Sequence, residues 1–312
     1  MTPRHFLRDD DLTPGELAEV LDLAAAMKAD RHLHRPLHGP KAVALIFDKP
    51  TLRTQLSFAA GVAELGGFPL TLDTGKVQIG ERESIADVTR VISRQVSAIV
   101  WRTYGQERIE EMAEHSSVPV INALTDQFHP CQILADLLTV REHKGELAGL
   151  TFTFAGDAAN NMAHSYLLGG AAAGMHVRLA APAGYHPDPQ IVADAEVIAA
   201  DTGASITVTT DAAAAFDGAD VIATDTWVSM GQEAEKMARA TPFQPYSVDQ
   251  AAVDKGNDPI VLHCLPAYRG LEIAADVIDG PRSVVWDEAE NRLHAEKALL
   301  TFLLANGAGV PR

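Results

Sequence analysis

The sequence has few cysteines, no excess of basic residues and no long apolar run. Only two cysteines, Cys131 and Cys264, occur among 312 residues, which argues against a disulfide framework and favours a reducing compartment. The formal net charge is −17, and no cluster of lysines and arginines suits nucleic acid. The first 20 residues lack the apolar core of a signal peptide, and no run could span a membrane. We therefore expect a cytoplasmic globular protein in which any anion site is a local feature.

Several common functional motifs are missing as well. The chain has no G-x-x-x-x-G-K-[ST], C-x-x-C, H-E-x-x-H or G-x-S-x-G, and its G-D-A-A-N-N turn at 156–161 is not G-x-G-x-x-G. A nucleotide-binding Rossmann protein is therefore disfavoured as an alternative. His129, Cys131, His263 and Cys264 could be combined into a split zinc site, but their spacing matches no standard ligand pattern.

The chain does contain a repeated alternation of short apolar runs and segments with helical spacing. Continuous apolar runs separated by helices are typical of parallel sheets that are covered on both faces. We therefore predict an α/β protein with two doubly wound parallel-sheet domains, spanning 1–145 and 146–288, and a final helix in 289–312 that packs back on the first domain. The predicted strands are 42–47, 68–72, 98–103 and 118–124, then 151–157, 176–182, 205–211, 220–227, 259–266 and 283–288.

The first helix has a clear start signal. Thr13, Pro14 and Glu16 fit the N-cap, N1 and N3 positions of a capping box. Apolar residues then follow at helical spacing from Leu17 to Met27. The sequence therefore predicts a helix that begins at Pro14.

Polar and reactive residues collect where the predicted strands end. In open α/β sheets, ligands bind beyond the carboxyl ends of the strands, so a site in a cleft between the two domains is expected. Each residue also has an ordinary reading, as a helix cap, a turn residue, a surface charge or a buried filler, and only their repeated placement favours a site. These residues are Thr51, Arg53, Thr54, Arg102, His129 and Gln132, then Asn160, Asn161, Asp225, Ser229, Met230, His263 and Cys264.

The turn K-P-T-L-R-T at 49–54 is the most informative of these strand ends. A helix N-terminus offers unpaired N–H groups and a partial positive charge, and hydroxyls with a guanidinium strengthen that preference for an anion. A capped helix with a surface arginine is the alternative. From this turn alone the two readings are equally good.

Taken in order along the chain, the motifs resemble those of ornithine carbamoyltransferases over essentially the whole length. K-P-T-L-R-T-Q-L-S-F resembles the family's carbamoyl-phosphate loop, and F-H-P-C-Q-I-L-A-D, D-T-W-V-S-M-G-Q-E, H-C-L-P-A-Y-R-G and D-E-A-E-N-R-L-H-A-E-K-A-L-L resemble further family blocks. The S-M-G loop and H-C-L-P point to ornithine rather than aspartate as the acceptor. The resemblance implies transfer of a carbamoyl group from carbamoyl phosphate to ornithine, giving citrulline and phosphate, without metal or organic cofactor.

The resemblance also implies roles for individual residues. Arg53, Arg102, His129 and Cys264 are the expected catalytic residues. Gln78 is expected to reach the phosphate of a neighbouring subunit, which implies a homotrimer with shared sites. The remaining expected ligands of carbamoyl phosphate are Thr51, Leu52, Thr54, Gln132, Leu265 and Arg292, and those of ornithine are Asn161, Asp225, Ser229, Met230, Cys264 and Leu265.

Three departures from the family pattern leave alternatives open. Leu52 replaces a threonine, Gln55 replaces an arginine, and Tyr268 stands where histidine is common, but we expect activity to survive all three. The alternatives are a carbamoyltransferase for another amine, such as acetylornithine or putrescine, and a non-catalytic relative that regulates a partner. Asp225 argues against the other amines because it needs a free α-amino group as partner. Arginine synthesis is preferred over breakdown as the physiological role.

Overall fold

The computed structural model describes residues 3–72, 78–227 and 241–307. The chain divides into two compact units, with Met1–Ala135 and Asn291–Arg312 in unit 1 and Asp136–Glu290 in unit 2. Two helices, α6 (Pro130–Lys144) and α13 (Val285–Gly307), contribute residues to both units. The predicted boundary at residue 145 lies just after α6. The assignment of carbamoyl phosphate to the first domain and of ornithine to the second stays a prediction.

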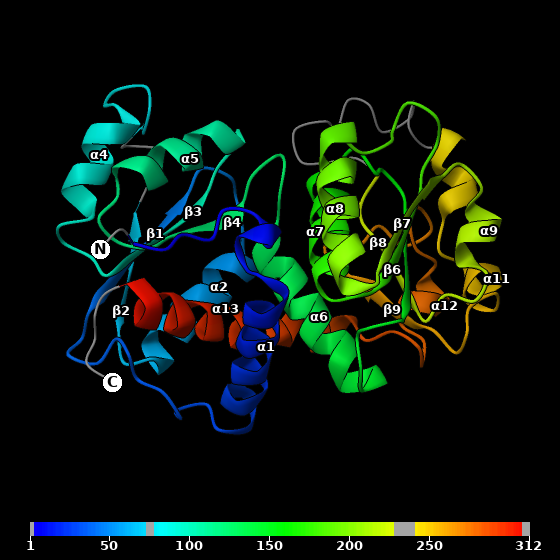
Figure 1. Cartoon of the computed structure of the whole chain (residues 1–312), viewed down its shortest axis with the longest axis horizontal. Helices are drawn as coiled ribbons and strands as arrows, with labels where there is room; N and C mark the ends of the chain where they lie inside the picture. The colour runs from blue at the N-terminus through cyan, green and yellow to red at the C-terminus, as the bar shows by residue number, and fades with distance from the viewer. Residues whose placement is uncertain (1–2, 73–77, 228–240, 308–312) are drawn as a thin grey trace. The chain divides into compact units, whose positions relative to one another are not determined.

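Unit 1 is built on a parallel sheet with the strand order β2-β1-β3-β4. Helices α4 and α5 cover one face of this sheet, and α2 with part of α13 covers the other (Figure 1). The chain winds from β1 to β2 and then returns to the other side of β1, so the topological switch point lies between β1 and β3. The strands are β1 (Ala42–Phe47), β2 (Phe68–Leu72), β3 (Ala98–Arg102) and β4 (Val120–Leu124), and the helices are η1 (Asp9–Asp11), α1 (Pro14–Ala29), α2 (Arg53–Glu64), α4 (Ile85–Ile92) and α5 (Gln106–His115).

Unit 2 has a parallel sheet with the order β7-β6-β5-β8-β9. Helices α7 and α8 cover one face, and α9, α11 and α12 lie on the other (Figure 1). The switch point here lies between β5 and β8. The strands are β5 (Thr151–Ala155), β6 (His176–Ala180), β7 (Ser205–Thr209), β8 (Val221–Thr224) and β9 (Ile260–His263), and the helices are α7 (Asn161–Ala172), α8 (Pro189–Thr202), α9 (Ala212–Phe216), η3 (Gln244–Tyr246), α11 (Gln250–Val253) and α12 (Ala275–Ile278).

The central strands explain why continuous apolar runs were informative. All residues of β3 and β4 are buried, as are the four inner residues of β1. A strand covered by helices on both faces has no solvent side, so its sequence does not alternate. The prediction of two parallel-sheet α/β domains is therefore confirmed. The expected cleft between the domains stays a prediction.

The predicted last strand, at 283–288, is wrong. Only Ser283 forms a β-bridge, to Val261, and the chain then enters α13 at Val285 rather than near Asn291. The β-branched and aromatic letters S-V-V-W favoured a strand. The acidic residues Asp287 and Glu288 fall in the first helical turn, where they suit the positive end of the helix dipole, and this preference prevailed.

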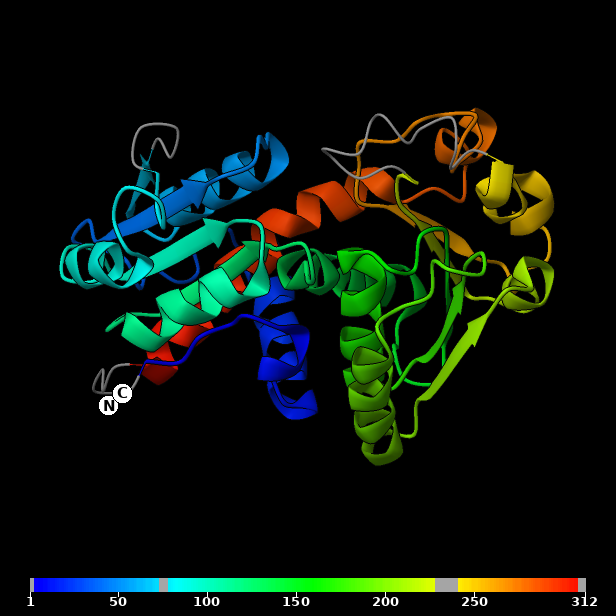
Figure 2. The same cartoon turned by 90° about the horizontal axis from the view of Figure 1, so that it is seen from above.

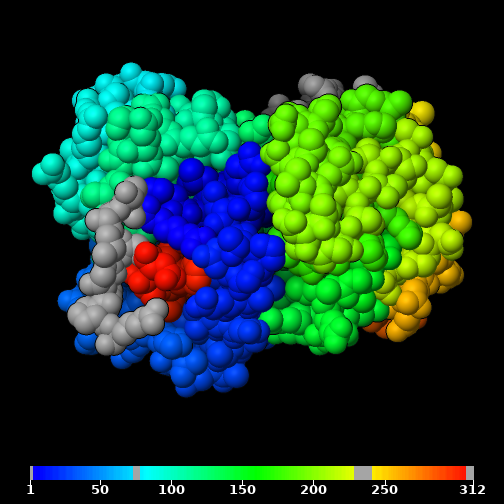
Figure 3. Space-filling view, in the orientation of Figure 1, coloured from blue at the N-terminus to red at the C-terminus, as the bar shows by residue number. Residues whose placement is uncertain are grey.

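The N-terminal helix forms as predicted and meets the C-terminal helix within unit 1. The Thr13 hydroxyl accepts the Glu16 N–H, and the Glu16 carboxylate accepts the Thr13 N–H at 2.9 Å. Figure 2 shows α13 as one continuous helix, and Figure 3 shows its end beside the N-terminal segment, where the Arg4 guanidinium lies 5.3 Å from the centre of the Phe302 ring. Within the described ranges, no helix is long and apolar enough to cross a membrane.

Candidate functional site

The turn after β1 is fixed against the end of β3. The Asp48 carboxylate accepts hydrogen bonds from Trp101 Nε1 at 3.0 Å and from Thr103 Oγ1 at 2.7 Å. The Asp48 N–H donates to the Arg102 carbonyl at 2.9 Å. These bonds hold the loop at the switch point of unit 1, which is where an α/β sheet binds its ligand.

Helix α2 begins at this turn without a side-chain cap. Leu52 occupies the N-cap position, makes no capping hydrogen bond through its side chain and is 74% exposed. Leu52 therefore does not supply the side-chain acceptor that a capping residue provides. Of the two readings of K-P-T-L-R-T, this geometry agrees better with an anion site than with a capped helix.

Three arginines act on a single buried imidazole in unit 1. His129 lies directly before α6 and is 5% exposed. Burial and the charges of Arg292, Arg102 and Arg53 hold the pKa of His129 well below its usual range. The imidazole is therefore neutral at physiological pH and can act as a hydrogen-bond donor or acceptor. A neutral histidine among three guanidiniums suits a small anion with a polar carbonyl group.

Arg292 joins this cluster to two further predicted ligands. Its guanidinium donates to Thr54 Oγ1 at 2.8 Å and to Gln132 Oε1. Thr54, Gln132 and Arg292 are each 3% exposed or less. Six residues that the sequence predicted for carbamoyl phosphate are thereby brought together, namely His129 and Arg292 with Arg53, Thr54, Arg102 and Gln132. Thr51 lies half-buried in the turn that leads into α2.

Gln78 lies in a different setting. It is exposed and has a φ of 48°, and its carbonyl accepts the N–H groups of Glu81 and Arg82. An exposed glutamine held in a turn is available to another molecule. Its predicted contact with a neighbouring subunit stays a prediction.

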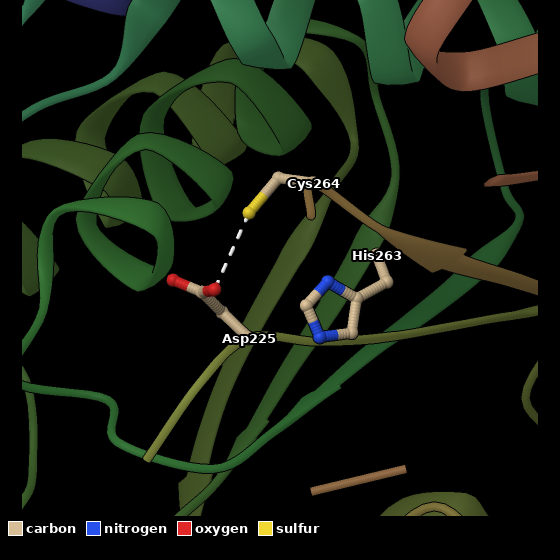
Figure 4. Close-up of side chains that lie close together, drawn as sticks. All are labelled: Asp225, His263 and Cys264. Atoms are coloured by element: carbon tan, nitrogen blue, oxygen red, sulfur yellow. Dashed lines mark hydrogen bonds between the residues drawn. The ribbon is translucent and has the colours of Figure 1, made fainter. Parts of the chain in front are cut away.

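In unit 2 the ends of β8 and β9 bring together Asp225 and Cys264. The Cys264 thiol donates to Asp225 Oδ1 at 3.3 Å, and Figure 4 shows these two side chains pointing toward each other beside His263. Burial raises the pKa of the Cys264 thiol well above its usual value, and the nearby carboxylates Asp225, Glu288 and Asp136 add to the increase. Burial also raises the pKa of Asp225. The thiol is therefore protonated at neutral pH, and the carboxylate would gain from a cationic partner.

His263 holds the turn that carries Cys264. Its Nδ1 accepts the Leu265 N–H at 2.9 Å, so the ring proton is on Nε2, which meets Glu272 Oε1 at 3.2 Å. The His263 N–H donates to Glu288 Oε2 at 2.8 Å. Leu265 has a φ of 57°, a conformation that non-glycine residues adopt mainly where the surroundings enforce it. The Cys264–Leu265 turn is therefore rigidly supported.

The other predicted ornithine ligands are only partly described. Asn161 is the first residue of α7, which follows β5, and is half-buried. Asn160, for which the ordinary reading was a turn residue, is the N-cap of α7, and its side chain accepts the Ala163 N–H at 2.9 Å. Ser229 and Met230 lie outside the described residues. Asn161 and Asp225 follow β5 and β8, the strands on either side of the switch point of unit 2.

A metal site is a possible reading of the same three side chains. The ligand atoms of Asp225, His263 and Cys264 lie within 4.8 Å of one another. However, both ring nitrogens of His263 are engaged, by Leu265 and Glu272, and the pKa of the Cys264 thiol is raised. Metal ligation needs a free imidazole nitrogen and a thiolate. The arrangement as it stands serves to support the turn.

Several supporting residues were not predicted from the sequence. Asp48 anchors the loop after β1, Glu272 and Glu288 hold His263, and Glu296 contacts Arg292 at 3.2 Å. Asp48 directly precedes the K-P-T-L-R-T turn, and that position could have identified it. Glu272 and Glu288 carry no local signal because His263 lies 9 and 25 residues away, whereas Glu296 pairs with Arg292 one helical turn away.

Comparisons with known proteins agree with this division of the site. The carbamoyl-phosphate-binding domain model of the aspartate/ornithine carbamoyltransferases matches residues 4–142, and the Asp/Orn-binding domain model matches 148–303. The ornithine carbamoyltransferase of Clavibacter michiganensis subsp. michiganensis is 62% identical, covering 96% of this chain and 98% of the relative. That of Mycolicibacterium paratuberculosis is 58% identical, covering 97% and 99%.

Solved structures give the same result. The ornithine carbamoyltransferase from Pyrococcus furiosus is 43% identical, with a TM-score of 0.94, covering 99% of this chain and 98% of that chain. A mutant N-acetyl-L-ornithine transcarbamylase is 33% identical, with a TM-score of 0.86, covering 96% and 99%. The fold is thus shared by enzymes for both amines, and both domain models together span almost the whole sequence. The chain belongs to the aspartate/ornithine carbamoyltransferase family.

Proposed function

We propose that the chain transfers the carbamoyl group of carbamoyl phosphate to the side-chain amine of L-ornithine, forming L-citrulline and phosphate. Relatives at 58–62% identity over nearly the full length are named for this reaction, which supports the proposal. The observation that carries it is the cluster of Arg53, Arg102 and Arg292 around a neutral His129, in a chain whose net charge is −17. Such a concentration of positive charge in an acidic protein suits a phosphate-bearing substrate.

In this proposal unit 1 binds carbamoyl phosphate. The first-turn N–H groups of α2, together with the Arg53 and Arg102 side chains, meet the phosphate. The neutral His129, with Gln132 and Arg292, meets the carbamoyl group and favours the negative charge that develops on its oxygen. The proposed ligands of carbamoyl phosphate within one chain are Thr51, Leu52, Arg53, Thr54, Arg102, His129, Gln132 and Arg292, together with Cys264 and Leu265 of unit 2.

Unit 2 binds ornithine. Asp225 pairs with the α-ammonium group, and Asn161, Ser229 and the Met230 backbone meet the α-amino and α-carboxylate groups. Acetylornithine carries an amide at the position that Asp225 would meet, and putrescine has no α-carboxylate, so both should be poorer substrates. A half-buried Asp225 left without a cation would be unfavourable, because desolvation already raises its pKa.

The attacking amine must first lose its proton. A free alkylamine has a pKa of about 10.4, and desolvation beside arginines lowers it. The raised pKa of Cys264 means that the thiol holds its own proton at neutral pH. We therefore propose that Cys264 and the Leu265 carbonyl orient the amine and that Cys264 does not receive the proton. Retention of measurable turnover by Cys264→Ser, with an unchanged pH optimum, would support orientation.

We also propose a homotrimer in which Gln78 serves the site of a neighbouring subunit. The exposed position of Gln78 supports this proposal. Two variants, Gln78→Ala and Arg53→Ala, would each be inactive alone. Unfolding and refolding an equal mixture of them should restore about a quarter of all sites, because each mixed trimer gains one site with Arg53 from one subunit and Gln78 from the next. Absence of recovery in mixed trimers would refute the shared site.

For the cellular role we propose arginine synthesis in the cytoplasm. Cys131 and Cys264 are free thiols, and a site that contains a thiol suits a reducing compartment. A strain lacking the gene should need arginine and should be rescued by citrulline but not by ornithine. Rescue by ornithine would contradict this role.

The central experiment measures citrulline formation with ornithine, acetylornithine and putrescine as parallel acceptors. We expect turnover with ornithine only, and a loss of about 100-fold or more in Arg53→Ala, because a charge-assisted phosphate contact contributes several kcal/mol. Arg90→Ala is the matched control, since Arg90 is exposed on α4 of the same unit and pairs only with Asp87 among the described contacts. Turnover with acetylornithine instead of ornithine would reassign the acceptor, and no turnover with any amine would refute the reaction.

A further inference from the structure

Arg292 is held by an acidic residue one helical turn further along α13. Glu296 Oε1 accepts from Arg292 Nη2 at 3.2 Å, and the two side chains are 1% and 3% exposed. The same guanidinium donates to Thr54 on α2 and to Gln132 on α6. One arginine thus connects three helices of unit 1, and one carboxylate lies behind it.

The hydrogen bond from Arg292 to Glu296 restricts the orientation of the guanidinium group. The N–H groups of arginine form a rigid planar fork, so each hydrogen bond to an Nη atom restricts the orientation of the whole group. The long arginine stem otherwise allows many rotamers. With Glu296 in place, the fork faces Thr54 and Gln132, which are both proposed ligands of carbamoyl phosphate.

The backbone of α13 is secured by a separate contact. Lys297 is fully buried and donates to Glu64 Oε2 on α2 at 2.7 Å. A Cβ atom at Gly61 would lie 3.1 Å from Lys297 Cγ, so α2 and α13 pack closely at this point. The Lys297–Glu64 pair therefore holds the helices together without touching Arg292. It provides a control that separates helix packing from arginine orientation.

We propose that Glu296 is a positioning residue for carbamoyl-phosphate binding, which holds the Arg292 guanidinium toward Thr54 and Gln132. This inference rests on the proposed function, since carbamoyl phosphate is the ligand proposed for unit 1. Glu296 acts through Arg292 and does not itself touch the substrate.

The charge state of Glu296 changes near neutral pH. Burial raises its pKa to about 7, although the Arg292 charge and the Ser57 hydroxyl act in the opposite direction. When Glu296 is protonated, the positive charge of Arg292 is fully available to an anion. When it is ionised, its negative charge offsets part of the Arg292 charge, so carbamoyl phosphate should bind more weakly above pH 7.

The groups around this pair are largely fixed in charge. Cys131 on α6 stays a thiol, because burial raises its pKa and the Glu296 charge adds to the increase, as does Asp9 from η1. His129 stays neutral because its pKa is lowered. Lys297 is committed to Glu64. Of Cys131, His129 and Glu296, it is Glu296 whose pKa lies near neutrality.

The test measures the Kd of carbamoyl phosphate by calorimetry, together with KM and kcat, at about pH 6 and about pH 8.5 in three variants. In Glu296→Gln, the affinity at low pH should match the wild type, and the weakening of about three- to tenfold at high pH should disappear. In Glu296→Ala, Kd and KM should rise about tenfold or more at both pH values with a smaller change in kcat, because the guanidinium loses its anchor. Glu64→Gln should lower stability and leave Kd unchanged.

The outcomes separate the two proposals. If the wild type binds carbamoyl phosphate but never turns over ornithine, the proposed reaction fails and the Kd values still decide the role of Glu296. If Glu296→Gln keeps the wild-type pH dependence, or if folded Glu296→Ala binds as tightly as the wild type, the positioning role is refuted. If the wild type does not bind carbamoyl phosphate at all, both proposals fall.

Discussion

Replacing Glu296 with glutamine should make the stability of unit 1 less dependent on pH, in favour of the variant as the pH rises. In the folded chain the pKa of this carboxyl is about 7, against 4.5 for the ordinary side chain. Between these values the folded state binds a proton that the unfolded state does not, so unfolding releases it. The contribution of the Glu296 carboxyl to the free energy of unfolding is therefore complete below pH 4.5 and is lost as the pH rises through 7.

The magnitude follows from the same shift. One pKa unit corresponds to about 1.4 kcal/mol, so the whole displacement corresponds to about 3 kcal/mol. Between about pH 5.5 and about pH 8, the contribution of the wild-type carboxyl falls by about 2 kcal/mol. Glutamine keeps the volume and an oxygen that can accept from Arg292, but it does not titrate. The difference between variant and wild type should therefore shift by about 2 kcal/mol in favour of the variant over this range.

Urea unfolding at the two pH values measures this difference. Trp101 is fully buried in β3 of unit 1. Its fluorescence reports on the unfolding of that unit once Trp227 and Trp286 of unit 2 are replaced by phenylalanine. Comparing Glu296→Gln with its parent cancels the titration of every other group. A shift below about 0.5 kcal/mol would mean that Glu296 is ionised in the folded chain at all these pH values, and would refute the reasoning.

Glu64→Gln is the control for this experiment. Burial tends to raise the pKa of Glu64, but hydrogen bonds from Arg31 and Lys297 outweigh it and the pKa is lowered. The contribution of such a carboxylate is present above its ordinary pKa and is lost only in more acidic solution. Glu64→Gln should therefore destabilise unit 1 by a similar amount at both pH values.

Four further predictions test other parts of the molecule. Thr13→Ala should lower the free energy of unfolding by about 1 kcal/mol, whereas Thr13→Ser should leave it nearly unchanged, as urea titrations would show. Gly170→Ala places a Cβ atom 2.5 Å from Val177 Cγ2 and should cost about 1–3 kcal/mol; failure of an added Val177→Ala to relieve the cost would contradict overpacking. Asp225→Asn should raise KM for ornithine about 100-fold and leave the Kd of carbamoyl phosphate unchanged, and an equal rise in both would argue for general disruption. Because its pKa is raised, Cys264 should react with iodoacetamide far more slowly at neutral pH than a free thiol, and fast alkylation would show that it is ionised.

The central strands were predictable because a strand that is buried on both faces has a continuous apolar sequence. Strand 42–47 matches its predicted bounds, since an apolar run between two polar turns has few other ways to be buried, and the edge strand 68–72 also matches although none of its residues is buried. The error at 283–288 arose where the same letters open a helix. Val284 and Val285 are buried there as a strand would be, so burial alone did not separate the two structures. Helix-dipole chemistry at Asp287 and Glu288 was the better guide.

Most of the predicted site residues follow strands, and Arg292 on α13 is an exception. Arg102 ends β3, Arg53 opens the helix that follows β1, and Asn161 and Asp225 follow β5 and β8. Parallel strands deliver their carboxyl ends to one edge, so position along the chain predicts proximity in space. That inference needs no knowledge of long-range packing. Position along the chain could identify residues that face a ligand, but not the residues that hold those side chains in place.

Arg292 and Glu296 show where such reasoning stops and what signal could extend it. Arg292 meets Gln132 and Thr54 across 160 and 238 residues of chain, a separation that no local pattern encodes. Read alone, a charged i, i+4 pair on a helix suggests a solvated face. Yet α13 is buried on nearly every side from Asn291 to Leu303, and a charge is tolerated in such a helix only when it is paired. The segment A-L-L-T-F-L-L at 298–304, which follows the pair on α13, is apolar enough to predict that this helix is buried. A charged pair next to such a segment therefore indicates an internal network, and Glu296 is the member of this network that can change its charge near neutral pH.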